Sequence, residues 1–266
     1  MQFLKNIKLF IKNIKEYFNY AVRSAKAELH SEVTDSYLNW LWWIIEPLCF
    51  MMIYVLVFGY IFKAREEYFI PFVLIGITVW QFFNRMITGS IKLVVQNRDI
   101  VTRVYIPKYI LLLAKSFTYL FKLFISFGIL FLIMLFLKVP FTLNILYMIP
   151  ILIVFYVISF GIGCILMHYG VYVQDLAKLT DIVLKLVFYL SGIFYNINIR
   201  LKGRAAFLLL RFNPVAFLMN EFRKVIIYAS NPSFKGLLFW FIMGTFLTII
   251  GVSIIHKNEN SYAKVI

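Results

Sequence analysis

NILYMIPILIVFYVISFGIGCILM, residues 144–167, contains no charged side chain. A helix needs about 20 apolar residues to cross a hydrocarbon core about 30 Å thick, so this stretch is long enough to span a membrane. Its β-branched and aromatic residues also suit strands, but an uninterrupted run of this length favours a helix, which closes its backbone hydrogen bonds within itself. The stretch therefore predicts a transmembrane helix.

Other apolar runs of similar length lie at roughly 40–62, 69–91, 109–137, 179–196 and 236–256. The run at 109–137 is longer than a perpendicular crossing requires, and we expect it to tilt or to extend into the cytoplasm. The sequence thus predicts an all-α membrane protein with six transmembrane helices in residues 40–256. A cytoplasmic segment, 1–39, precedes them, and a cytoplasmic tail, 257–266, follows.

The composition supports a membrane domain. The chain has 266 residues, of which 62% are hydrophobic and 15% charged, whereas a soluble domain has roughly 45–50% apolar and about 25% charged residues. The net charge of +15 indicates contact with anionic lipid headgroups. Nucleic acid is not expected as a partner, because no basic patch with interleaved aromatic residues is present.

Residues 1–22 have a helical pattern of a different kind. Apolar positions recur at three- and four-residue steps, and so do lysines on the opposite face. The apolar set is Phe3, Ile7, Phe10, Ile14, Tyr17 and Ala21, and the basic set is Lys5, Lys8, Lys12 and Lys15. This pattern predicts an amphipathic helix in the membrane interface. A helix that packs on a protein partner is the alternative.

The distribution of Lys and Arg predicts the orientation. With the N-terminus in the cytoplasm, the four cytoplasmic segments hold thirteen of these residues and the two short outer loops hold three. Segment 197–235 holds seven more, but long loops influence topology less. We expect both termini in the cytoplasm.

The apolar stretches 205–210 and 215–219 within segment 197–235 are too short to span. We expect them to form re-entrant or interfacial helices between the fifth and sixth spans. The basic residues Arg200, Lys202, Arg204 and Arg211 are then expected to face the outer leaflet.

No constellation of catalytic residues is present. The chain has no glycine-rich phosphate loop of the GxxxxGK[ST] type and no Ser-His-Asp or HExxH grouping. Its two cysteines form no CxxC pair, and its three histidines are far apart in sequence. We therefore expect a protein that is not an enzyme and binds no cofactor or metal.

Ionisable residues inside predicted spans are candidates for function, because charge is costly in the membrane. They are Glu46, Arg85, Lys115, Lys122 and Lys185. Arg85 and Lys115 lie near cytoplasmic ends, where a long side chain can reach water. Lys122 and Lys185 lie deeper, where an anionic substrate or Glu46 as a partner would stabilise them. Glu46, Lys122 and Lys185, together with the aromatic residues Tyr54 and Phe58, are the candidate pathway residues.

Eight short segments occur in a characteristic order and spacing. They are LWWIIEPL (41–48), YVLVFG (54–59), FVLIG (72–76), WQFF (80–83), NRDIVTRVYIP (97–107), YVQDL (172–176), LSGIFY (190–195) and NP (213–214). This series resembles the permease subunits of type 2 ATP-binding-cassette exporters over nearly the whole chain. The most similar branch moves lipid-linked polysaccharides such as O-antigen, capsule and teichoic acid.

The resemblance implies a homodimer of six-span subunits docked on two ATPase subunits, which bind ATP and Mg. It implies a conduit for a lipid-linked glycan along the dimer interface and gate helices within 197–235. Segment 97–107 would be the cytoplasmic coupling helix, with Asn97, Arg98, Asp99 and Arg103 as contacts. Gln174 and Asp175 would form a second contact with the ATPase.

Two positions depart from the family pattern. Ser36-Tyr37-Leu38-Asn39 stands where the family often has a Leu-Gly pair before the first span. Ser191-Gly192 replaces a frequent Ser-Pro, so we expect a softer kink in the fifth span.

Three other functions remain open. A type 2 exporter of drugs or small lipids would share the architecture. An ion-coupled secondary transporter would use Lys122 and Lys185, although no inverted repeat of the kind common in such folds is visible. A membrane-embedded glycosyl- or acyltransferase needs a positioned acid, base or nucleophile, and the chain has only twelve acidic residues.

Overall fold

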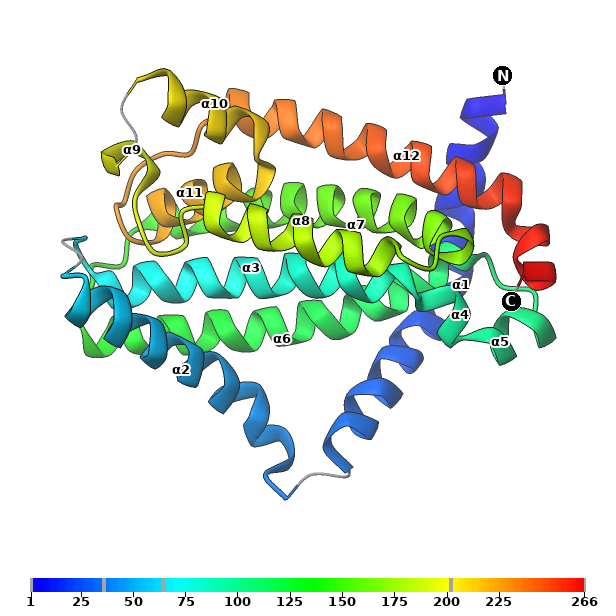
Figure 1. Ribbon diagram of the computed structural model, residues 1–266, viewed down its shortest axis with the longest axis horizontal. Coiled ribbons are helices and arrows are strands. Elements are labelled where there is room, and N and C mark those ends of the chain that lie inside the picture. The colour runs from blue at the N-terminus through cyan, green and yellow to red at the C-terminus, as the bar shows by residue number, and fades with distance from the viewer. Residues whose placement is uncertain (1, 35–36, 64–65, 201–202, 266) are drawn as a thin grey trace.

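The computed structural model describes residues 2–34, 37–63, 66–200 and 203–265, and these contain helices and no strand. Figure 1 shows long helices that run side by side, with short helices at both ends of the bundle. The elements in chain order are α1 (Gln2–Thr34), η1 (Asn39–Leu41), α2 (Trp42–Tyr54), η2 (Val55–Ile61), α3 (Phe69–Ile91), α4 (Leu93–Gln96), α5 (Arg98–Arg103), α6 (Lys108–Phe136), η3 (Leu143–Tyr147), α7 (Met148–Tyr172), α8 (Leu176–Leu190), α9 (Ile197–Arg200), α10 (Arg204–Phe212), α11 (Pro214–Ile226) and α12 (Phe234–Val265).

Among the described residues, 5 helical stretches are long and apolar enough to cross a membrane. They are Asn39–Ile61, Phe69–Ile91, Lys108–Phe136, Leu143–Tyr172 and Phe234–Tyr262. Each coincides with a predicted span to within a few residues at either end. The expected long helix at 179–196 is different, because α8 has only 15 residues, or about 22 Å of helix.

The glycine at position 192 explains the early end of α8. Gly192 has a φ of +67°, in the left-handed region that glycine adopts without the steric cost of a Cβ atom. It follows the C-cap residue Ser191, where such a glycine commonly ends a helix. The expectation of a softer kink is therefore wrong: the helix ends and the chain turns.

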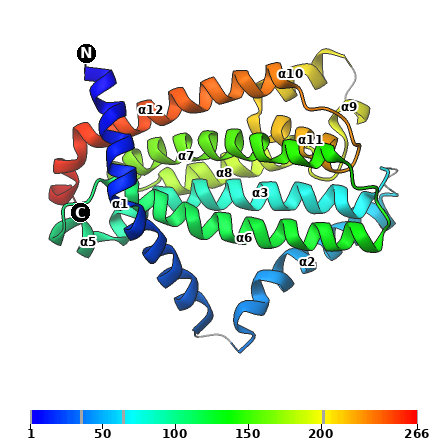
Figure 2. The same ribbon diagram turned by 180° about the vertical axis from the view of Figure 1, so that it is seen from behind.

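The centre of the bundle is α3, which packs against α6 and α7 (Figures 1 and 2). In its most apolar stretch 72% of the residues are buried, against 6% in the stretch that contains α2. Helices α7 and α12 approach each other closely at glycines. A Cβ atom on Gly161 would lie 2.7 Å from the main-chain nitrogen of Thr248, and such small residues allow helices to pack closely in membranes.

Helix α1 is continuous over 33 residues and crosses the α5 end of the bundle. Its second half then leaves the bundle and converges on the start of α2, so that the two helices form a V (Figure 1). From Phe10 onward the predicted apolar stripe of α1 packs on the chain's own core: Phe10 contacts Tyr109 of α6, and Ala21 is fully buried. Lys12 and Lys15 are exposed. The amphipathic pattern thus has an intramolecular explanation in addition to the expected membrane interface.

The residues predicted as a C-terminal tail continue α12 as a helix to Val265. Tyr262 is buried, and its hydroxyl lies 2.7 Å from Nδ1 of His168 on α7. Glu259 accepts a hydrogen bond from Tyr105, just beyond α5, at 2.9 Å. The end of α12 therefore packs on the segment that follows α5.

The two short helices expected within 197–235 are present as α10, with 9 residues, and α11, with 13 residues. They lie at the end of the bundle remote from α5 (Figure 1). Helix α11 begins at Pro214, where the Asn213 side chain accepts hydrogen bonds from the main-chain N–H groups of Val215 and Ala216. Such an Asn-Pro pair is a favourable helix start.

Candidate functional site

A cleft of about 220 Å³ lies between α2, α3 and α8 and combines aromatic rings with polar groups. Two of the predicted pathway residues, Glu46 and Tyr54, line it. The other lining residues are Phe50, Ile77, Trp80, Gln81, Asn84, Arg85 and Phe188. The structure therefore brings together a carboxylate, a guanidinium, two amides and four aromatic rings.

Glu46 and Arg85 form an ion pair in this cleft, with 2.7 Å between Oε1 and Nη2. The two side chains are 41% and 26% exposed, so the pair is accessible to a molecule in the cleft. From its position near a helix end, Arg85 was expected to reach water. It instead lines the cleft and pairs with Glu46. Charged hydrogen-bonding groups of this kind recognise hydroxyls and anionic groups of a ligand.

An aromatic series extends the cleft toward the end of the bundle remote from α5. The rings of Phe58 and Phe194 are parallel within 2° and their centroids lie 4.2 Å apart. Tyr54 lies 4.6 Å from Phe194, and Phe188 links Phe194 to Trp80 with separations of 5.5 and 5.2 Å. The predicted residues Tyr54 and Phe58 thus belong to one cluster with α3, α8 and the turn after α8.

The backbone of α2 changes beside this aromatic cluster. Residues Val55–Ile61 form a π-helix of 7 residues, a rare form that often marks functional sites. Earlier in α2, Pro47 lies inside the helix and lacks the N–H that would bond within the helix. Both irregularities lie in the stretch that carries Glu46, Tyr54 and Phe58.

The other two pathway candidates lie outside the cleft. Lys122 forms an ion pair with Glu32 of α1, with 2.6 Å between Nζ and Oε2. Together with Arg85 it also lines a separate cavity of about 10 Å³ between α3 and α6. Lys185 is exposed on α8. The structure thus gives Lys122 an intramolecular partner other than Glu46.

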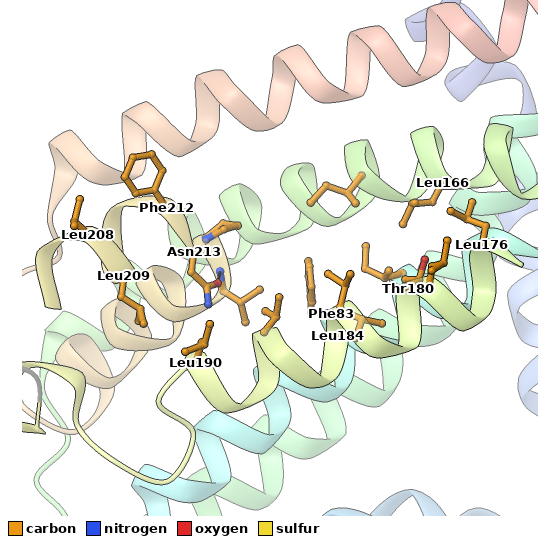
Figure 3. Close-up of a pocket in the computed structure, with 17 residues that line it drawn as sticks. Phe83, Leu166, Leu176, Thr180, Leu184, Leu190, Leu208, Leu209, Phe212 and Asn213 are labelled. Carbon is orange, nitrogen blue, oxygen red and sulfur yellow. Dashed lines mark hydrogen bonds between the residues drawn. The ribbon is translucent and has the colours of Figure 1, made fainter. Parts of the chain in front are cut away.

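A longer apolar groove of about 880 Å³ follows the opposite side of α8 (Figure 3). Its walls come from α3, α7, α8, α10 and the start of α11, and the polar side chains among them are Thr180 and Asn213. Val187 and Leu190 face this groove, whereas Phe188 lines the polar and aromatic cleft. Helix α8 therefore separates a polar space from an apolar one.

The predicted coupling residues lie at the opposite end of the bundle from α10. Arg98, Asp99 and Arg103 lie in α5, and the Asp99 and Arg103 side chains, 4.0 Å apart, are 90% and 79% exposed. Asn97 precedes the helix, but its side chain donates to the Leu93 carbonyl at 2.8 Å instead of capping α5.

The second predicted contact lies between α7 and α8. Gln174 is exposed, and Asp175 is the N-cap residue of α8 and pairs with Lys178 at 3.3 Å. The connection between α7 and α8, which contains both residues, lies at the same end of the bundle as α5 (Figure 1). The exposed residues that were predicted to contact the ATPase thus lie at one end of the protein.

The outer basic residues are exposed where the structure describes them. Arg200 ends α9, Arg204 begins α10, and Arg211 lies 5.5 Å from the ring of Phe207. All three are exposed, and Lys202 lies outside the described residues. Arg223 of the same segment is instead buried in α11, with 4% exposure.

Sequence reasoning did not assign Trp80, Gln81, Asn84, Phe188 or Phe194 to the site. A signal was present for α3, because Trp80 and Asn84, and likewise Gln81 and Arg85, are spaced by four residues and share a helix face. For Phe188 and Phe194 no comparable signal exists, because their partners belong to other helices.

The fold, with its long membrane helices and its exposed short helix at one end, is that of a multi-pass membrane protein. Residues 24–227 match the family described as ABC-2 type transporter, and the chain belongs to this family. It is similar to the O-antigen export system permease protein RfbA of Klebsiella pneumoniae, with 23% identity over 256 residues, 96% of this chain and 97% of that protein. The protein of the same name from Myxococcus xanthus is 22% identical over 255 residues, covering 96% and 98% of the two chains.

Proposed function

We propose that the chain is the membrane-spanning subunit of an exporter that moves a lipid-linked polysaccharide across the bacterial plasma membrane. The family membership and the O-antigen export permeases that match along 96% of the chain support this function. The sequence has no GxxxxGK[ST] loop. In this proposal two copies of a separate ATPase subunit, which bind ATP and Mg, supply the energy.

The observation that carries the proposal is the division of space by α8. A lipid-linked glycan has a polar sugar part and a hydrocarbon part. The cleft with Glu46, Arg85 and Trp80 offers hydrogen-bonding groups and flat rings to the sugar. The apolar groove on the other side of α8 offers aliphatic walls to the hydrocarbon chain. One helix thus presents both surfaces that such a substrate requires.

The course of the chain supports six crossings. The N-terminus, the C-terminus and α5 all lie at one end of the bundle (Figure 1), which requires an even number of crossings. Helix α8 provides the sixth crossing although it is short. Helices α10 and α11 occupy the part of the membrane thickness that α8 does not reach. We assign the α5 end, with both termini, to the cytoplasm and α10 and α11 to re-entrant positions near the outer leaflet.

A second copy of the chain is the proposed partner for α2 and α8. The apolar stretch that contains α2 is only 6% buried, and Ile182, Leu186 and Tyr189 of α8 are exposed. A homodimer would cover these faces and place the two clefts along a shared conduit. The exposed residues of α5, with Gln174 and Asp175, would then contact the ATPase subunits.

The first part of α1 is assigned to the membrane interface. Its exposed residues Lys12 and Lys15 suit anionic headgroups, each with about 1 kcal/mol of attraction near a charged membrane surface. Its apolar stripe is held by the bundle. This arrangement explains why a helix with so polar a face continues directly into a membrane domain.

The test is export in a bacterium from which the gene has been deleted. We expect lipid-linked glycan to accumulate inside, surface glycan to disappear, and a tagged copy of the chain to restore export and to co-purify with an untagged ABC ATPase. Normal surface glycan without internal accumulation would overturn the assignment of substrate. Loss of drug or small-lipid efflux instead would favour the related exporter of such compounds.

A further inference from the structure

Arg223 of α11 is buried in the outer half of the protein and bonded to main-chain oxygens. Its Nη1 donates to the Gly192 carbonyl at 2.8 Å, and its Nη2 donates to the carbonyls of Ile193 at 2.8 Å and Phe72 at 3.1 Å. Its guanidinium also lies 3.4 Å from the centroid of the Phe72 ring. All its hydrogen bonds within the part of the chain that the structure describes go to such carbonyl oxygens.

These acceptors come from segments far apart in sequence. Phe72 lies in the first turn of α3, and Gly192 and Ile193 form the turn after α8. A planar guanidinium has five N–H donors in a rigid fork and can bond several acceptors at once. Arg223 therefore joins α3, α11 and the turn after α8 through a single side chain.

The sequence leaves room for this guanidinium at Gly76. A Cβ atom at position 76 would lie 2.8 Å from Nη2 of Arg223 and 3.1 Å from the Ile193 oxygen. The end of α8 is fixed a second time, because the Asn213 side chain donates to the Ser191 hydroxyl at 3.1 Å. The turn after α8 is thus built against α3 and α11 with little free space.

The residue after this turn closes the aromatic series. Phe194 directly follows Ile193, and its ring is only 7% exposed because it stacks on Phe58 and contacts Tyr54. The position of the Ile193 carbonyl sets the direction in which the Phe194 side chain leaves the backbone. Arg223 consequently influences the contacts that Phe194 makes with Tyr54 and Phe58, although it does not itself contact these two residues.

We propose that Arg223 is a positioning residue that holds Phe194 against Phe58 and Tyr54 and so closes the end of the cleft remote from α5. This role deepens the proposed function, since the cleft is the proposed glycan path. Burial of a guanidinium is costly unless its donors are satisfied. The carbonyls of Gly192 and Ile193 accept from the guanidinium only while the turn keeps this conformation.

The experiment observes Phe194 directly. The full-length chain, assembled with its ATPase in lipid nanodiscs, carries para-fluorophenylalanine at position 194, and its ¹⁹F resonance is compared between variants. Arg223→Lys keeps the charge but loses the planar fork, and Arg223→Gln loses the charge. Arg211→Gln is the control, since Arg211 is an exposed arginine of the neighbouring helix α10.

We expect a resonance shifted by ring stacking in the wild type and in Arg211→Gln. In both Arg223 variants the resonance should broaden and move toward the chemical shift of para-fluorophenylalanine in water. An unchanged resonance in a folded Arg223→Lys protein would overturn the proposal. If the Arg223 variants do not fold, Gly76→Ala decides, because it displaces the guanidinium without removing it and should move the resonance in the same direction.

Export is measured in the same variants, so that the two proposals can fail separately. A moved resonance with loss of surface glycan supports both the positioning role and the glycan path. If the resonance moves in the Arg223 variants but deletion of the gene leaves surface glycan normal, the positioning role of Arg223 stands and the proposed glycan substrate is wrong. The spectrum does not depend on which substrate is carried.

Discussion

Lys122 of α6, a residue inside a predicted span, forms an ion pair with Glu32 of α1, with 2.6 Å between Nζ and Oε2. One turn earlier on α1, Glu28 bonds Lys115 and accepts from Thr118 at 3.3 Å. Two acids spaced by four residues on α1 therefore face two lysines on α6. The two acids of α1 therefore compensate the charges of Lys115 and Lys122, and no ionic substrate is needed to explain these two lysines.

Loss of the Lys122 charge should destabilise the chain. Lys122 and Glu32 are 16% and 34% exposed, between the buried and the surface case, so we expect Lys122→Met to cost about 1–2 kcal/mol. Thermal unfolding in detergent measures this cost, and the exposed Lys185→Met should change stability by less than about 0.5 kcal/mol. Equal effects of the two substitutions would contradict the pairing, as would additive effects in a double-mutant cycle with Glu32→Gln.

Glu46→Gln should impair export without preventing assembly. The substitution keeps the shape of the side chain but leaves Arg85 without its negative partner in the cleft. Charged hydrogen bonds contribute about 1.5–3 kcal/mol, so we expect export to fall about tenfold or more. Surface glycan relative to the amount of chain in the membrane is the measurement. Glu16→Gln, at an exposed position of α1, is the control, and an equally small effect of both would exclude Glu46 from the glycan path.

Asp99→Arg should separate coupling from folding. The Asp99 side chain is 90% exposed, and an i,i+4 pair with Arg103 contributes only about 0.3–0.5 kcal/mol, so insertion and dimer assembly should remain. A reversed charge at a docked contact is repelled, and we expect export and co-purification of the ATPase to be lost. Normal values for both would show that α5 is not the contact, whereas restoration by a charge reversal on the ATPase would identify its partner.

The outer basic segment tests the orientation of the chain. Single cysteines at Arg200 and Arg204, in a background with Cys49→Ser and Cys164→Ala, should react with a membrane-impermeant thiol reagent added to intact cells, because both positions are exposed. A cysteine at Asp99 serves as the inner control and should react only after permeabilisation. The reverse pattern would place α5 outside and overturn the assigned topology.

Much of the fold was predictable because it depends on local sequence. The spans at 69–91 and 109–137 follow from apolar length, and the short helices around 205–210 and 215–219 follow from runs too short to cross. The common face of Asp99 and Arg103 follows from helical spacing. The fifth span was overestimated, because apolar residues continue past the point where Gly192 ends α8.

The sequence by itself determined the long apolar helices at 40–62, 69–91, 109–137, 144–167 and 236–256, because run length and periodicity are properties of neighbouring residues. Only the tertiary structure decided which charges meet. Glu46 and Arg85 are 39 residues apart in the chain, and Arg223 is 151 residues from Phe72. Such partners are set by how far each helix is rotated and shifted against the next, and this depends on the packing of all the helices together. For that reason Lys122 meets Glu32, and Phe194 of the turn after α8 stacks on Phe58 of η2.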